Sequence, residues 1–157
     1  MIKNYINIYN NLIKLTRNKK LFSNFTKKDE FSDRLLIFLI HFGFFLKVYK
    51  SKESKKTMQS IYDYVFKQLE VTIREIGYGD ASINKQMKMY INLFHSLIIK
   101  IESWDSLNQE NKNNFFCYYL NKSMNMENLI QYFDNYYTFL KNNTFNSFSK
   151  GVIKINF

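Results

Sequence analysis

The residue types best suited to chemistry are gathered in the stretch TIREIGYGDASINKQMKMY, residues 72–90. It holds two of the chain's four glycines, an Arg–Glu pair, an aspartate, a serine and two lysines. Glycines beside such groups are typical of phosphate-binding loops. A P-loop, however, requires GxxxxGK[ST], and a dinucleotide-binding loop requires GxGxxG, each after a strand. Because GYGD follows a helical pattern and lacks a third glycine, neither phosphate-binding motif is present.

The same stretch has the features of a turn between two helices. Gly77 fits the left-handed position that ends a helix, and Gly79 gives the backbone freedom to reverse. Asp80 or Ser82 is then expected to cap the next helix through its side chain. The sequence therefore predicts a helix, a reversal and a capped second helix.

Two lysines near the start of that second helix indicate a role beyond turning the chain. Lys85 and Lys88 are three residues apart and are expected to share one exposed face, where cations slightly oppose the helix dipole. We interpret the stretch as a polar interaction surface; the alternative is a structural turn held by local salt bridges. The candidate residues are Arg74, Glu75, Gly77, Gly79, Asp80, Ser82, Lys85 and Lys88.

Elsewhere the chain lacks the residue spacings that enzymes use. His41 and His95 each lie in an apolar helical segment, where a histidine packed in the core is expected. Cys117 lies in the aromatic run NFFCYYL, which favours a buried, inert thiol. A Cys117–His95 nucleophile pair has no support beyond the residue types, and no cluster has the spacing of a zinc site. We therefore expect a protein that is not an enzyme, with no metal, no cofactor and no small-molecule substrate.

The apolar pattern predicts an all-α fold. The chain has no proline, and its apolar residues recur at helical spacing in six segments. We expect one domain over residues 1–157, a bundle of about six helices with short loops and an extended C-terminal tail ending in VIKINF. Ser106 and Asn125 are expected caps. The predicted helices span residues 2–15, 31–49, 56–76, 83–102, 107–120 and 126–140.

The most apolar segment is LLIFLIHFGFFLKV, residues 35–48. It is shorter than the roughly 20 apolar residues that a membrane span needs, so a central core helix is expected. Neither a signal peptide nor more than one cysteine is present, which favours a cytoplasmic protein without an internal disulfide. Peripheral contact with a membrane stays open.

Charge is the second functional signal. Lysine and arginine number 23 against 13 acids, a formal net charge of +10, which favours anionic partners such as RNA, ribosomes or acidic lipid head groups. An AT-rich genome would explain part of the lysine excess. The surplus is largest before the first acid, with cations at Lys3, Lys14, Arg17, Lys19, Lys20, Lys27 and Lys28.

The stretch REIGYGDASINKQMKMY resembles the hallmark segment of the ubiquinol–cytochrome c chaperone family, whose bacterial members carry a similar REMGVGD…S…K…KKM run. DEFSDRLLIFLIH is similar to a second family segment, and IYNNLIKLTRNKKLF and KGVIKINF resemble the family's first helix and its closing element. Thr16 replaces the usual alanine, Leu35 replaces a phenylalanine, and the usual proline near the end is absent. The matching residues are Arg17, Asp29, Phe31, Arg34, His41, Arg74, Glu75, Gly77, Gly79, Asp80, Ser82, Lys85, Lys88, Met89, Gly151 and Phe157.

The resemblance implies an all-helical assembly chaperone for ubiquinol–cytochrome c reductase, respiratory complex III. Family members hold newly made cytochrome b while it acquires haem; in mitochondria they act with a small partner chaperone near the ribosome exit. For this chain it implies apo-cytochrome b as client, at the cytoplasmic (or matrix) face of the inner membrane, in an α-proteobacterial type of cell. The alternative, from charge alone, is a basic helical RNA- or ribosome-binding module.

Overall fold

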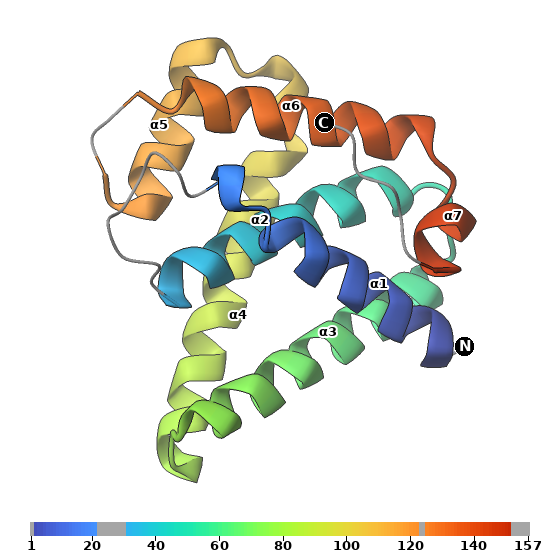
Figure 1. Ribbon diagram of the computed structural model, residues 1–157, viewed down its shortest axis with the longest axis vertical. Coiled ribbons are helices and arrows are strands. Elements are labelled where there is room, and N and C mark those ends of the chain that lie inside the picture. The colour runs from blue at the N-terminus through green and yellow to red at the C-terminus, as the bar shows by residue number, and fades with distance from the viewer. Residues whose placement is uncertain (1, 22–30, 123–124, 152–157) are drawn as a thin grey trace.

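The computed structural model describes residues 2–21, 31–122 and 125–151, and the elements within these ranges are all helical (Figure 1). This confirms the predicted all-α fold. Two 3-10 turns, η1 (Lys19–Leu21) and η2 (Trp104–Ser106), accompany the α-helices. The α-helices are α1 (Ile2–Thr16), α2 (Phe31–Tyr49), α3 (Lys55–Ile76), α4 (Asp80–Glu102), α5 (Gln109–Leu120), α6 (Glu127–Asn142) and α7 (Phe145–Ser149).

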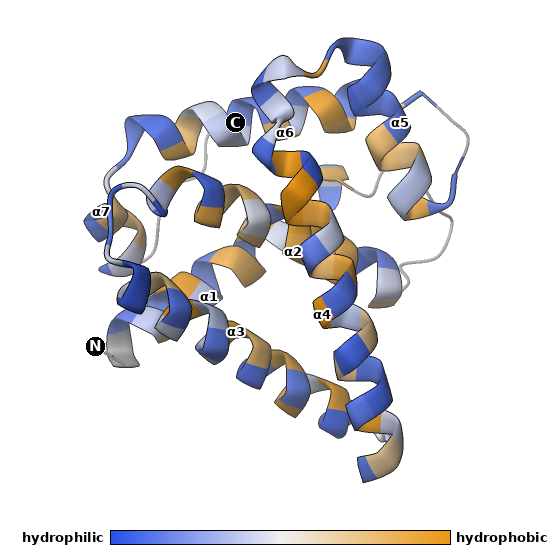
Figure 2. Ribbon diagram, turned by 180° about the vertical axis from the view of Figure 1, so that it is seen from behind, coloured by the Kyte–Doolittle hydropathy of each residue, from blue (hydrophilic) through white to orange (hydrophobic). Residues whose placement is uncertain are grey.

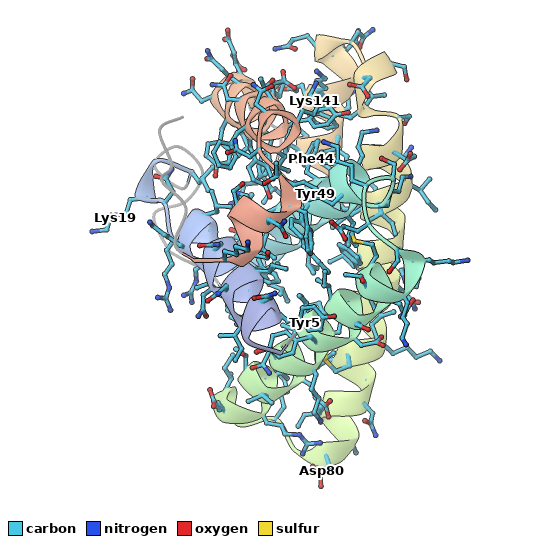
Figure 3. All side chains as sticks on the ribbon, turned by 90° about the vertical axis from the view of Figure 1, so that its right-hand side faces the viewer. Tyr5, Lys19, Phe44, Tyr49, Asp80 and Lys141 are labelled. Atoms are coloured by element: carbon cyan, nitrogen blue, oxygen red, sulfur yellow. The ribbon has the colours of Figure 1, made fainter. Side chains whose placement is uncertain are left out.

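Helix α2 forms the centre of the bundle. Every residue over 35–45 is buried, so the most apolar segment is a core helix as predicted. Helix α1 packs on α2 and α3, whereas α4 crosses α2 on the opposite side (Figures 1 and 3). Gly43 permits a close crossing, because a Cβ there would lie 2.7 Å from Cδ1 of Ile101. No helix in the described ranges is long and apolar enough to cross a membrane.

A buried histidine connects α2 to α6. His41 is fully buried, its Nδ1 donates to the carbonyl of Ile37 (2.8 Å), and its Nε2 accepts from the hydroxyl of Tyr132 (2.7 Å). The hydroxyl of Tyr136 donates to the backbone carbonyl of His41 at 2.9 Å. Burial lowers the pKa of His41 to about 3, so the ring is neutral at physiological pH. The predicted core role of His41 is confirmed.

Helices α3 and α4 form a hairpin whose closed end projects from the rest of the molecule (Figure 1). Asp80, the first residue of α4, lies at the end of this projection (Figure 3). The predicted apolar stripe of α3 is buried except for Tyr62, which is half-buried. Only Ile83, Phe94, Leu97 and Ile101 of α4 are buried. The half-buried apolar positions of α4 reflect a helix that extends past the central layer, which its periodicity alone does not reveal.

Several predicted helix starts are wrong by a few residues. Helix α4 begins at Asp80, with Gly79 at the N-cap and no side-chain capping bond, so neither Asp80 nor Ser82 caps it. Helix α5 begins after Asn108, whose side chain accepts from the backbone of Asn111, whereas Ser106 ends η2. In each case a neighbouring residue with extended backbone geometry already meets the requirement for a helix start.

The N-cap of α6 is Met126 instead of Asn125, although the Asn125 side chain does accept a hydrogen bond from the backbone amide of Glu127, two residues further on. The tail was predicted as extended but contains α7. Asn11 of α1 holds this part of the chain by donating to the carbonyls of Phe148 (2.8 Å) and Gly151 (2.7 Å). The predicted extended VIKINF element falls on residues 152–157, outside the described ranges.

Candidate interaction surface on the α3–α4 hairpin

The hairpin tip, residues 74–88, is built around two glycines with different roles. Gly77 has a φ of 109° and donates its N–H to the carbonyl of Arg74 (3.0 Å), which ends α3 in the predicted left-handed conformation. Gly79 has ordinary extended geometry, with φ −71° and ψ 161°, and its carbonyl accepts from Ile83. Only Gly77 therefore requires glycine for conformational reasons.

Arg74 ties the two arms of the hairpin together. Its guanidinium donates from Nη1 to Oδ1 of Asp80 (2.5 Å) and from Nη2 to Oε1 of Glu70 (3.2 Å). The hydrogen bond from Arg74 is the main reason that the pKa of Glu70 is lowered. Arg74 and Asp80 thus fit the alternative interpretation of the motif, a turn held by local ion pairs.

The other charged residues of the tip face solvent. Glu75, Lys85 and Lys88 are exposed and form no ion pair with residues of the described ranges. Ile76 and Tyr78 are large apolar residues that are also exposed at the turn. Exposed charges combined with exposed apolar side chains are not needed to make a turn, so this part of the motif is available for a partner.

A groove of about 440 Å³ begins beside the tip and runs between α1, α2 and α3. Hereafter it is called the α1–α3 groove. Its charged residues are Arg17 from the end of α1, Arg34 from the start of α2, and Glu75 from the end of α3. Its apolar lining consists of Tyr9, Ile13, Phe31, Leu35, Phe38 and Leu69.

This groove brings together residues that lie in three separate sequence motifs. In the sequence, Arg17 and Arg34 match family motifs and Glu75 is a candidate surface residue, but their spacing along the chain does not predict that they share one site. Glu75 belongs to both the groove and the tip, so the two form one continuous surface. Helical periodicity fixes which face of each helix is apolar; it does not fix how α1 crosses α3.

The other titratable candidates do not join this surface. His95 is exposed, and its Nε2 lies 3.2 Å from the hydroxyl of Tyr62, so its predicted place in the core is wrong. Cys117 is half-buried instead of buried, with Nδ2 of Asn113 3.5 Å from its sulfur. Among the described residues, no three His, Cys, Asp or Glu side chains lie close enough together to hold a metal ion.

The fold is all-helical over the described residues, and the tip and the groove form a surface that carries both charged and apolar side chains. A sequence profile of the ubiquinol-cytochrome C chaperone family matches residues 23–110, more than half of the chain. The chain belongs to this family. No curated protein and no solved structure gives a significant match.

The matched range contains α2, α3, α4 and the whole hairpin tip. It includes two of the four resembling segments, DEFSDRLLIFLIH and REIGYGDASINKQMKMY; the segments with Arg17 and Gly151 lie outside it. Family membership supports a chaperone role in the assembly of ubiquinol–cytochrome c reductase, complex III.

Proposed function

We propose that this chain is the complex III assembly chaperone that binds newly made cytochrome b. The binding surface is the hairpin tip together with the α1–α3 groove. Cytochrome b is a membrane protein, so before assembly it exposes apolar segments that carry occasional polar groups. An apolar groove bordered by charged side chains suits such a segment, because it buries apolar area and still offers ionic and hydrogen-bonding partners.

The observation that carries this proposal is the position of Arg34 and Glu75. Both lie within the matched range, at the start of α2 and the end of α3, and both line the same apolar groove. The exposed tip residues Lys85 and Lys88 extend this surface along α4. A purely structural turn accounts for Arg74 and Asp80, but gives no reason for a charged, apolar-lined groove beside it.

The proposed working place is the cytoplasmic face of the inner membrane, or the matrix face in a eukaryote. There the basic surface would lie close to ribosomes and acidic lipids. The proposed role needs no catalysis and no bound cofactor. A small partner chaperone or the ribosome would act beside this chain.

The proposal is tested by recovering cytochrome b with a tagged chain from its native cells. Glu75→Lys reverses an exposed charge that forms no ion pair, and Glu110→Lys makes the same change on α5, away from the groove. Wild type and Glu110→Lys should recover cytochrome b, and Glu75→Lys should recover about tenfold less. Equal recovery by both variants would refute this binding surface.

The RNA-binding alternative is addressed in the same extracts at two salt concentrations. An RNA-binding module loses affinity steeply with salt because counterions are released from the phosphate backbone. Recovery of RNA with a steep salt dependence, and no cytochrome b, would overturn the proposal.

A further inference from the structure

The outward side of α4 carries cations and no acids. Between Asp80 and Glu102 the helix has three lysines and no aspartate or glutamate. Residues three, four or seven positions apart share one side of a helix. Such steps connect the three lysines with one another through exposed neutral residues, so all of them lie on one side of α4. We call this side the α4 outer face; it comprises Lys85, Lys88, Met89, Asn92, Ser96, Ile99 and Lys100, all of them exposed.

Large apolar side chains are exposed on the same face. Met89 is 50% exposed and Ile99 is 70% exposed. Helix α5 adds Tyr118, which is 77% exposed and lines a hollow of about 580 Å³ together with Lys100. Its neighbour Tyr119 is fixed against α4 by a hydrogen bond with Ser96. Single exposed apolar residues are common on protein surfaces, so none of these three indicates a contact by itself; the relevant observation is that Met89 and Ile99 lie on the same side of α4 as its three lysines.

The α4 outer face is separate from the α1–α3 groove. Helix α4 lies on the side of α2 opposite α1, and Figure 2 shows the molecule from that side. With 23 residues, α4 is about 34 Å long at 1.5 Å per residue. The face is thus an extended basic strip, with the hairpin tip at one end.

We infer that the α4 outer face docks on the surface of an anionic lipid bilayer. Lysines are attracted to acidic head groups, and their aliphatic stems can lie along the apolar boundary. Tyrosine is favoured at this depth because its ring is apolar and its hydroxyl is polar. Separate anchors at Met89, Ile99 and Tyr118 can enter the head-group region one by one, as the apolar side chains of interfacial helices do.

The composition of the face disfavours the other two classes of partner. Protein interfaces are depleted of lysine and bury a contiguous apolar core, whereas Met89 and Ile99 are separated by Asn92 and Ser96. Single-stranded RNA is held by several aromatic or arginine side chains that stack on successive bases; the α4 outer face has no arginine, and of its three apolar anchors only Tyr118 could stack on a base. Lipid is therefore the occupant that fits both the charge and the apolar groups.

The test is co-sedimentation of the full chain with phosphatidylcholine vesicles, with and without phosphatidylglycerol. Removing one lysine from an anionic surface costs about fivefold in binding (about 1 kcal/mol). The double variant Ile99→Gln with Lys100→Gln also removes an apolar anchor, so its binding to anionic vesicles should fall about tenfold or more. The matched control, Val71→Gln with Lys52→Gln, removes one exposed aliphatic residue and one exposed lysine elsewhere and should bind as wild type does.

Three results would overturn the inference: equal binding to neutral and anionic vesicles, equal loss in the variant and the control, or tight binding to an RNA oligonucleotide without vesicle binding. The inference does not depend on the proposed client. Ile99 and Lys100 lie outside the client surface, so recovery of cytochrome b from detergent extracts should be unchanged in the double variant. Failure of lipid binding and failure of client binding are thus separate results.

Discussion

Acid should destabilise this protein through one buried histidine. His41 is fully buried among α2 and α6 side chains, and burial lowers its pKa from 6.5 to about 3. In the unfolded chain the same ring binds a proton near pH 6.5. Since the unfolded state then holds more protons than the folded state, stability must fall as pH falls from 6.5 toward 3. Above pH 6.5 both states are neutral and the effect vanishes.

The size of the effect follows from the two pKa values. Each pH unit between them costs about 1.4 kcal/mol, so lowering the pH from 7 to 5 should reduce the free energy of unfolding by about 2 kcal/mol through His41 alone. The variant His41→Gln stays neutral over this range and keeps a carbonyl that can accept from Tyr132.

Urea unfolding at pH 7, 6 and 5 measures the prediction for wild type and His41→Gln. The variant will be less stable at pH 7 if its packing is poorer, but the comparison concerns the change with pH. Wild type should lose about 2 kcal/mol more than the variant between pH 7 and 5. Parallel pH curves would refute the buried, neutral state of His41.

Four further substitutions test the hairpin and the helix crossing. Gly77→Ala should lower the free energy of unfolding by about 1 kcal/mol because alanine is strained at φ 109°, whereas Gly79→Ala should change it little. Urea unfolding of the two variants measures this difference, and equal losses of stability would contradict it. Gly43→Leu should lower the free energy of unfolding by about 1–3 kcal/mol, because even a Cβ at this position would lie 2.7 Å from the Ile101 side chain. Thermal or urea unfolding measures the loss, and wild-type stability would contradict the close crossing of α2 and α4. Arg74→Ala should speed amide hydrogen exchange at the hairpin tip and leave the free energy of global unfolding nearly unchanged. Amide protection equal to that of the wild type would show that the Arg74–Asp80 ion pair does not hold α3 and α4 together at the tip.

The sequence predicts the helices of this chain well because local physics decides them. The predicted ranges for α2 and α3 agree with the structure to within one residue, since a strong apolar pattern marks both helices and Gly77 marks the end of α3. The start of α4 was misplaced because Ser82 and Asp80 are good capping residues by type, yet Gly79 already has the extended geometry that a helix start needs. Residue type is a weaker guide than backbone geometry at such a turn.

Contacts between distant segments are beyond the reach of periodicity. His95 has apolar neighbours in sequence and is predicted to lie in the core, but Phe94 and Leu97 take the buried side of α4 and His95 lies on a side that faces solvent. The α1–α3 groove is a second example, because it depends on the angle at which α1 crosses α2 and α3. The acid-free face of α4 could have been found from the sequence by plotting its charges on a helical wheel.

The same physics distinguishes the structural part of the tip from its functional part. Gly77 and the Arg74–Asp80 ion pair form the turn and need no partner. Glu75, Lys85 and Lys88 are exposed and form no ion pair among the described residues. Glu75 lines the α1–α3 groove, and the two lysines lie on the α4 outer face. Among the tip residues, the proposed binding role therefore depends on the second group, together with Arg34 and the apolar lining of the α1–α3 groove.

The proposed chaperone role is tested most directly by the amount of assembled complex III in native cells that lack this protein. Deletion of the gene should strongly reduce both assembled complex III on native gels and haem-loaded cytochrome b, and the wild-type gene should restore both. The Glu75→Lys variant should restore much less than the Glu110→Lys control. Normal amounts of complex III in the deletion strain would rule out a role for this protein in complex III assembly.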